Sequence, residues 1–280
     1  MNKRIFWFFL LLPILAVGLY LYFSAPEESP ELPLPPPPVT ESEPEPAIRY
    51  PVPEPAPVVP DDALELTAEP EEMLPEPETE EPLPALEDSD GPMTRVYEEL
   101  FGEPALERWF NLANPVRHMV ATIDSAGREK MAIKQRPLKP VEGGFLVEGN
   151  EERMVIHPDN SRRYLPYVRL AEALDLDRMA ERYFRFYPLF QQAYEELGYP
   201  DAYFNDRLVE VIDLLLATPE PKAPVVLVRP HVLYEYADPE LEALTAGQKL
   251  LIRVGPENAA RLKARLWELR ALLVGDAPSG

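Results

Sequence analysis

Apolar positions form an unbroken run near the start of the chain, from Ile5 to Phe23. A run of this kind has about the length, roughly 20 residues, that crosses the core of a bilayer as a helix. Lys3 and Arg4 precede it and acidic residues follow it, which by the positive-inside tendency leaves residues 1–4 in the cytoplasm. We therefore predict a single-pass transmembrane helix, with everything after Phe23 exported.

A cleaved signal peptide is the alternative interpretation of the same run. The apolar region of such a peptide is usually shorter, about 7–15 residues. The small residues that cleavage would need, Ser24 and Ala25, follow bulky Phe23 and precede Pro26. These features favour an uncleaved anchor.

The second stretch, residues 24–85, consists mainly of proline and glutamate and shows no helical or strand periodicity. Proline fixes φ and removes a backbone donor, and like charges repel, so we expect a disordered linker with polyproline II character. Such a linker would separate the membrane from a folded domain, and a docking motif for a proline-binding partner is the alternative. Ile48, Arg49 and Tyr50 interrupt the pattern and are candidates for a short anchoring motif.

The third stretch, residues 86–275, is expected to fold as one domain, followed by a tail over residues 276–280. Helices are predicted at 93–102, at 105–112, from Pro115, from Pro166, from Asp175 or Asp177 to Gly198, at 203–216, from Asp238, from Thr245 to Gly255 and from Pro256. Short strands are predicted at 145–147 and 153–156, paired as a hairpin around Gly149 and Asn150, and at 225–228 and 231–236. The predicted fold is mainly α with a small β component (α+β).

Two helices carry the pattern expected of the core. The longer helix has an aromatic stripe at helical spacing, made of Met179, Tyr183, Phe186, Tyr187, Phe190, Tyr194 and Leu197. Asp201 is a candidate cap for the next helix, whose inward residues are predicted to be Phe204, Leu208, Val211, Ile212 and Leu215. The opposite face of that helix carries Asp206, Glu210 and Asp213.

Composition limits the chemistry that this chain can support. Its 280 residues include no cysteine, which removes disulfides, thiolate nucleophiles and cysteine metal sites. The net charge of −22 is concentrated in residues 24–92, which hold twenty acidic groups and one basic group, Arg49. Residues 93–280 are only mildly acidic and give no electrostatic support for nucleic-acid binding. The three histidines show no metal-ligand spacing, and no phosphate or dinucleotide motif is present.

Candidates for partner binding lie in two places. Asn205 sits at the edge of the apolar face of its helix, where a structural hydrogen bond to a loop and a ligand contact are the alternatives. The run containing Arg229, His231, Tyr234 and Tyr236 interleaves basic and aromatic groups on extended chain. Such a strip could dock a partner at a strand edge or stack on a sugar, and ordinary strand packing is the alternative.

The carboxylates Asp206, Glu210 and Asp213 are the candidates for acid/base chemistry. A general acid/base pair needs two carboxyls whose environments separate their pKa values. A solvated helix face with local ion pairing, to which Arg207 would contribute, explains the same spacing. We expect no enzymatic activity.

Two long blocks of the domain resemble a known family. They read YPLFQQAYEELGYPDAYFNDRLVEVIDLLLATPEP at 187–221 and VRPHVLYEYADPELEALTAGQKLLIRVGPENAARLKARL at 228–266. These blocks resemble the bacterial domain-of-unknown-function family 3014, and the likeness extends from about Leu86 to Leu273. Members are similarly built, with an N-terminal membrane segment, a proline-rich linker and this domain, so the resemblance implies a Gram-negative inner-membrane setting. It implies no activity, ligand or catalytic residue.

Together these patterns predict a non-enzymatic, membrane-tethered periplasmic domain that acts as a scaffold or adaptor in the cell envelope through a protein partner. A peptidoglycan-binding module is the alternative within binding. An envelope hydrolase that uses acidic residues such as Asp206 or Glu210 is the alternative from another class. No cofactor, metal ion or nucleic acid is expected as a ligand.

Overall fold

The computed structural model describes residues 48–53, 82–150, 152–222 and 224–275. The expected cytoplasmic stub, the apolar run, most of the proline-rich linker and the C-terminal tail lie outside this part of the chain. Within the described ranges, no helix is both long enough and apolar enough to span a bilayer.

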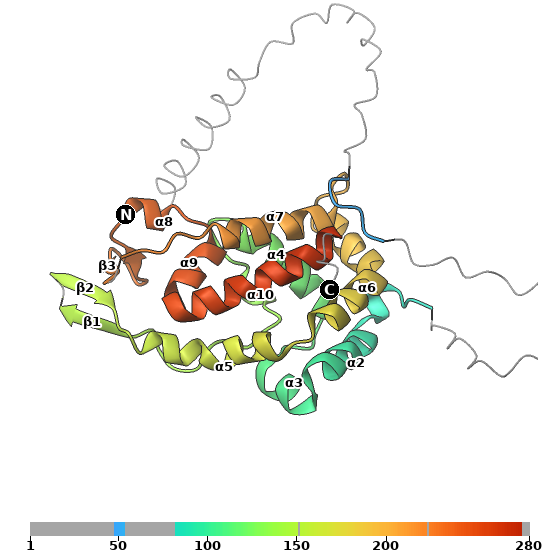
Figure 1. The fold of residues 1–280 in the computed structure, drawn as a ribbon, viewed down its shortest axis with the longest axis horizontal. Helices are drawn as coiled ribbons and strands as arrows, with labels where there is room; N and C mark the ends of the chain where they lie inside the picture. The colour runs from blue at the N-terminus through green and yellow to red at the C-terminus, as the bar shows by residue number, and fades with distance from the viewer. Residues whose placement is uncertain (1–47, 54–81, 151, 223, 276–280) are drawn as a thin grey trace, which may run out of the picture. The chain divides into compact units, whose positions relative to one another are not determined.

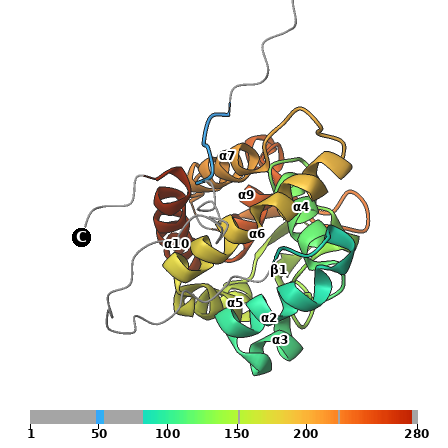
Figure 2. The same ribbon diagram turned by 90° about the vertical axis from the view of Figure 1, so that its right-hand side faces the viewer.

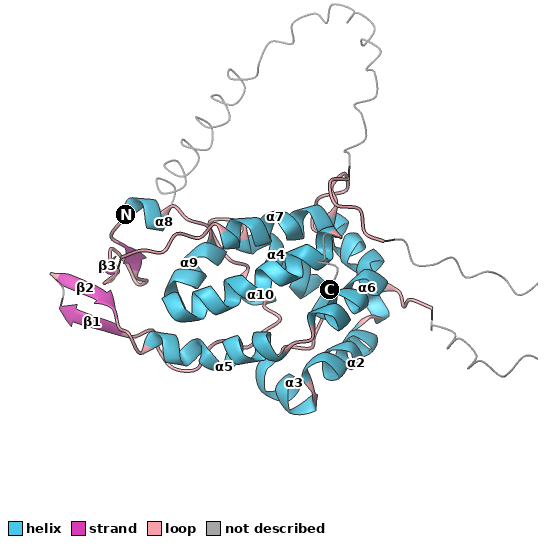
Figure 3. Cartoon of the chain, viewed as in Figure 1, coloured by secondary structure: helices cyan, strands magenta, loops and turns pink. Residues whose placement is uncertain are grey.

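The described residues are mainly helical with one small sheet, which confirms the predicted α+β class (Figure 3). The helices are η2 (Leu86–Asp88), α2 (Asp90–Phe101), α3 (Glu103–Trp109), α4 (Pro115–Ala126), η3 (Ile133–Gln135), α5 (Asn160–Ala173), α6 (Leu176–Glu196), α7 (Phe204–Leu216), α8 (Pro239–Glu242), α9 (Ala246–Arg253) and α10 (Pro256–Val274). The strands are β1 (Val147–Asn150), β2 (Arg153–Ile156), β3 (Val226–Val228) and β4 (Glu235–Tyr236).

Several helices begin where local capping chemistry predicts. The Asp175 carboxylate accepts the backbone N–H of Arg178 at the start of α6. Thr245 and Gln248 form the predicted capping box of α9, in which each side chain accepts the other residue's backbone N–H. Pro115 and Pro256 occupy the first helical turns of α4 and α10, where the missing proline N–H costs no hydrogen bond.

The start of α5 differs from the prediction, because the helix begins at Asn160 and continues through Pro166. Its first turn is fixed before the proline is reached, since Asn258 of α10 donates a hydrogen bond to the Ser161 carbonyl. Inside the helix the proline removes one backbone hydrogen bond without ending it. The assignment of Pro166 as the first helical residue was therefore wrong.

Asp201 is not the cap of α7, contrary to expectation. The residue at the cap position is Tyr203, which makes no side-chain capping bond. The Gln191 side chain of α6 instead accepts the backbone N–H of Phe204 at 2.9 Å. The Gln191 side-chain amide of α6 thus takes the capping role that was expected of the Asp201 carboxylate.

The four strands form one antiparallel sheet in the order β1-β2-β3-β4. The predicted hairpin is present, but Gly149 and Asn150 belong to β1 and the turn follows them. The second extended piece is shorter than predicted, because only Glu235–Tyr236 pairs as a strand. Asn160 joins the hairpin to α5, since its side-chain oxygen accepts the Leu146 N–H at 2.9 Å.

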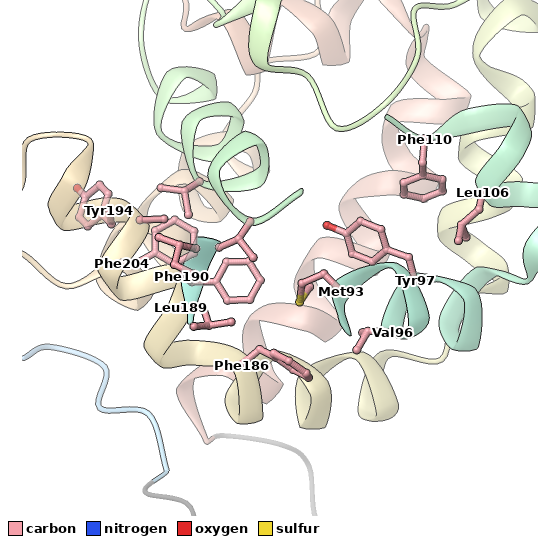
Figure 4. Close-up of a cluster of buried hydrophobic side chains, with 14 residues drawn as sticks. Met93, Val96, Tyr97, Leu106, Phe110, Phe186, Leu189, Phe190, Tyr194 and Phe204 are labelled. Atoms are coloured by element: carbon pink, nitrogen blue, oxygen red, sulfur yellow. The ribbon is translucent and has the colours of Figure 1, made fainter. Parts of the chain in front are cut away.

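The main core lies between α2, α4, α6 and the start of α7 (Figures 2 and 4). Its buried members are Leu86, Met93, Val96, Tyr97, Leu106, Phe110, Val116, Val120, Phe186, Leu189, Phe190, Ala193, Tyr194 and Phe204. Phe186, Phe190 and Tyr194 confirm the predicted aromatic stripe of α6. Leu197, expected in that stripe, is exposed because α6 ends at Glu196.

A largely buried ion pair joins α4 to α7. The Arg207 Nε donates to the Asp124 carboxylate at 3.1 Å, and Arg207 also donates to the Asp124 carbonyl at 2.8 Å. Arg128 pairs with the same carboxylate at 2.9 Å. This network turns Arg207 toward α4, which leaves its neighbour Asp206 on the outer side of α7.

Candidate functional site

The segment 48–53, drawn blue in Figure 1, lies against one end of α7 through hydrogen bonds to its backbone. The two oxygens of the Asp206 carboxylate accept the N–H groups of Arg49 at 2.9 Å and Tyr50 at 2.7 Å. The Asn205 side-chain amide donates to the Tyr50 carbonyl at 2.9 Å. Two neighbouring side chains of α7 therefore bond three backbone groups of two successive residues, Arg49 and Tyr50, which lie more than 150 positions earlier in the sequence.

Asn205 is held in one orientation by a second partner. Its side-chain oxygen accepts the Tyr183 hydroxyl at 3.0 Å, so its NH₂ group is directed to Tyr50. Asn205 is 0% exposed, and burial raises the pKa of Tyr183 well above its usual value, which keeps that hydroxyl protonated as a donor. Of the two alternatives for Asn205, the structural hydrogen bond to a loop is the one observed.

The side chain of Tyr50 supplies the apolar part of the contact. It packs against the buried cluster formed by Val209 and Ile212 of α7 and Leu273 of α10. Tyr50 is half-buried, whereas Arg49 is exposed. The segment is thus anchored by its backbone and by one aromatic ring, as expected for the anchoring motif at Ile48, Arg49 and Tyr50.

Arg49 lies beside the acidic face of α7. It borders two hollows, of about 220 and 270 Å³, and Glu210 lines both of them. Asp206 lines the first hollow and Asp213 the second. The one basic residue of the stretch 24–92 is therefore placed beside three carboxylates.

These three carboxylates have separate partners. Asp206 holds the segment, Glu210 accepts a hydrogen bond from Arg207 at 3.0 Å, and Asp213 accepts one from Arg270 of α10 at 2.5 Å. This arrangement matches the expected helix face with local ion pairing. Among the residues that the structure describes, no group of three or more His, Asp or Glu side chains could hold a metal ion.

The second candidate strip lies at the sheet, which Figure 1 places at the opposite end of the domain from the blue segment. The Arg229 guanidinium lies 5.3 Å from the centre of the Tyr234 ring, and His231 is exposed. Tyr236 is buried, and its hydroxyl donates to the Lys249 carbonyl at 2.9 Å. Tyr236 is therefore a core residue and is not available to a partner. Asn205 lies at the other end of the domain and does not form one site with this strip.

Sequence reasoning named Asn205 and Tyr50 but missed that they meet. It also assigned Asp206 only to solvent or to acid/base chemistry. The available signal was compositional, because Arg49 is the one basic residue in the stretch 24–92 and an aromatic residue follows it.

A comparison with protein families confirms the resemblance noted above. The model of the family described as "Protein of unknown function (DUF3014)" matches residues 115–270. The matched range includes α7 with Asn205 and Asp206 but not the segment 48–53. No curated protein and no solved structure matches the chain.

Proposed function

We propose that this protein, which belongs to the DUF3014 family, is a membrane-tethered periplasmic adaptor that binds an extended segment of an envelope protein partner. The observation that carries the proposal is the capture of two successive backbone N–H groups by the Asp206 carboxylate. The apolar run and the proline-rich stretch of the sequence support the anchor, the linker and the periplasmic location of the domain.

Backbone capture suits a peptide-binding site because main-chain hydrogen bonds supply affinity for any sequence, while side-chain pockets add selectivity. Here Asp206 and Asn205 bind the main chain, and the surface between α7 and α10 receives an aromatic ring. The acidic face of α7 favours a basic residue directly before that ring. The partner segment is therefore an extended one that carries a basic residue followed by an aromatic residue.

The segment 48–53 occupies this site in the described structure and acts as its resident ligand. A segment that belongs to the same chain binds as an intramolecular ligand, at an effective concentration set by the length of chain that joins it to the domain. A partner segment must displace it, so the free site is open for only part of the time. The resident segment thereby lowers the apparent affinity of the site for a partner segment.

The test uses the full chain, solubilised in detergent, with the site either vacated or disabled. Tyr50→Pro removes one N–H donor and the anchoring ring without changing the domain, so it vacates the site. The double variant Tyr50→Pro with Asp206→Ala also removes the carboxylate. Both chains serve as bait for solubilised cell envelopes, with intact cell-wall sacculi as a parallel input.

The proposal predicts a protein that the vacated chain retains, that the double variant loses, and that a peptide of residues 46–55 releases. Equal recovery by the two baits would overturn it. Retention on sacculi alone would point instead to a peptidoglycan-binding module. Release of wall fragments that depends on Asp206 or Glu210 would point to a hydrolase, and either result contradicts the adaptor.

A further inference from the structure

The part of the chain that precedes the domain is attached to it at two separate points. At the first point, two side chains of α7 bond the backbone of Arg49 and Tyr50. At the second point, Leu86 of η2 is 2% exposed and belongs to the main core. Both ends of the intervening stretch, residues 51–85, are therefore attached to the same domain.

The two attachments differ in how easily they open. Arg49 is exposed and Tyr50 is half-buried, and three hydrogen bonds and one ring hold them on α7. Leu86 lies inside the core, and the buried Ser89 hydroxyl donates to its carbonyl at 2.7 Å. Solvent-exposed contacts open at a lower free energy than the core of a domain does. The first attachment can therefore release while the second stays fixed.

We propose that docking of the segment 48–53 sets the length of the tether that joins the domain to the membrane, so that a partner which displaces the segment lengthens the tether. This inference rests on the anchor and the displaceable segment of the proposed function. With the segment docked, the tether ends at Arg49 and consists of residues 24–48. With the segment released, it ends at Leu86 and consists of residues 24–85.

The two tethers differ strongly in reach. At ~3.1 Å per residue, as in polyproline II, the docked tether spans at most about 80 Å and the released tether about 190 Å. The proline-rich composition of both stretches favours this extended conformation over a compact one. The domain therefore gains roughly 110 Å of reach when the segment leaves α7.

The coupling acts in both directions, because linkage between two equilibria is reciprocal. A partner segment that occupies the α7 site displaces the resident segment and gives the domain the longer reach. Conversely, a target more than about 80 Å from the membrane is accessible only to the released form, whose α7 site is vacant. Extension of the tether and competence for partner binding are thus properties of the same state.

The test measures the distance between the start of the tether and the domain, using single-molecule energy transfer on the full chain in lipid nanodiscs. The chain contains no cysteine, so Ala25→Cys with Ala260→Cys provides two unique positions for a pair of fluorophores. Ala260 is exposed in the N-terminal half of α10, whereas Leu273, which packs with Tyr50, lies near the C-terminal end of that helix. The label is thereby kept away from the docked segment.

Two different changes release the segment in this labelled chain. Asp206→Ala removes the acceptor on α7, and Tyr50→Pro removes one donor and the anchoring ring. Both should lower the efficiency of energy transfer, because the r.m.s. length of the tether rises roughly 1.5-fold with the square root of its residue number. Glu210→Ala, the matched control, should behave as the wild type. Unchanged efficiency in both release variants would overturn the proposal.

A peptide of residues 46–55 separates this inference from the proposed function. Its binding to the Tyr50→Pro chain is measured on the same samples by fluorescence anisotropy. Peptide binding without any change in energy transfer between the wild type and the release variants would contradict the tether lengths alone. A lower efficiency in both release variants without peptide binding would support the two tether lengths and overturn the peptide-binding site.

Discussion

The Asp206 carboxylate accepts the backbone N–H of Tyr50 at 2.7 Å, across 156 positions of the sequence. With the second bond from Arg49, the contact ties part of the proline-rich stretch to the folded domain. Both donors are main-chain N–H groups. Asp206 therefore recognises the backbone conformation of the segment and not the identity of its side chains. This property makes the site suitable for exchange between the resident segment and another protein.

Asp206→Ala should release the segment 48–53 while leaving the domain folded. Hydrogen bonds to a carboxylate contribute about 1.5–3 kcal/mol, and these are partly exposed, so we expect roughly tenfold faster amide exchange at Arg49 and Tyr50. Native-state hydrogen exchange measures this effect. Glu210→Ala is the matched control on the same helix, because Glu210 pairs with Arg207 and not with the segment. Equal exchange in both variants would contradict the assignment.

Asn205→Ala should destabilise the domain itself as well as the docked segment. The substitution leaves the buried Tyr183 hydroxyl without its acceptor, which costs about 1–3 kcal/mol, and it opens a small cavity. Chemical denaturation measures the change. Adding Tyr183→Phe should recover part of the loss, because the stranded hydroxyl is then absent. A double variant that loses the full sum of both single effects would contradict this coupling.

Asp124→Ala should lower the stability of the domain more than Asn205→Ala does. The substitution removes the carboxylate that pairs with the mostly buried Arg207 guanidinium. The side chains of Asp124 and Arg207 are 8% and 14% exposed. Removal of one member of a buried pair costs about 3–5 kcal/mol. Arg162→Ala serves as a control for ion pairing at the surface, where Arg162 pairs with Asp159. Similar losses in thermal unfolding for the two variants would refute a structural role for the α4–α7 pair.

Tyr236 should make stability fall at alkaline pH. Burial raises the pKa of its hydroxyl to about 12, because the phenolate would be desolvated. In the unfolded chain tyrosine titrates near pH 10. The folded state thus favours the protonated form, and its stability is retained below pH ~10 and lost as pH rises toward the folded pKa.

The expected loss between pH ~10 and ~12 is on the order of 1–3 kcal/mol for this one group. The measurement is the difference in unfolding free energy between the wild type and Tyr236→Phe across that range. The phenylalanine variant should show a smaller decline. Parallel pH curves would mean that the Tyr236 hydroxyl ionises equally well in both states.

Helix starts that are capped by residues nearby in the sequence were predicted correctly. A helix start whose partner lies on another helix was not. Asp175 and the pair Thr245–Gln248 cap their helices within a few residues, so their spacing is enough. At α7, by contrast, the N-terminal donor of Phe204 bonds to Gln191 on another helix, and the local candidate Asp201 is unused. Propensity cannot distinguish these two solutions because the choice depends on how α6 and α7 pack.

In the candidate site, too, the local feature was predicted and the distant partner was not. The position of Asn205 on the wheel of its helix left a structural hydrogen bond and a ligand contact as alternatives, and the hydrogen bond is present. Its partner Tyr50 lies 155 positions earlier, in a stretch whose composition indicates no packed structure.

The most direct test of the account is the binding of a labelled peptide of residues 46–55 to the full chain, measured by fluorescence anisotropy. We predict saturable binding to the vacated Tyr50→Pro chain and much weaker binding to the wild type, whose site is occupied. Combining Tyr50→Pro with Asp206→Ala should weaken binding by about tenfold or more. Failure of the Tyr50→Pro chain to bind, or equal affinity with and without the Asp206 carboxylate, would contradict the peptide-binding site.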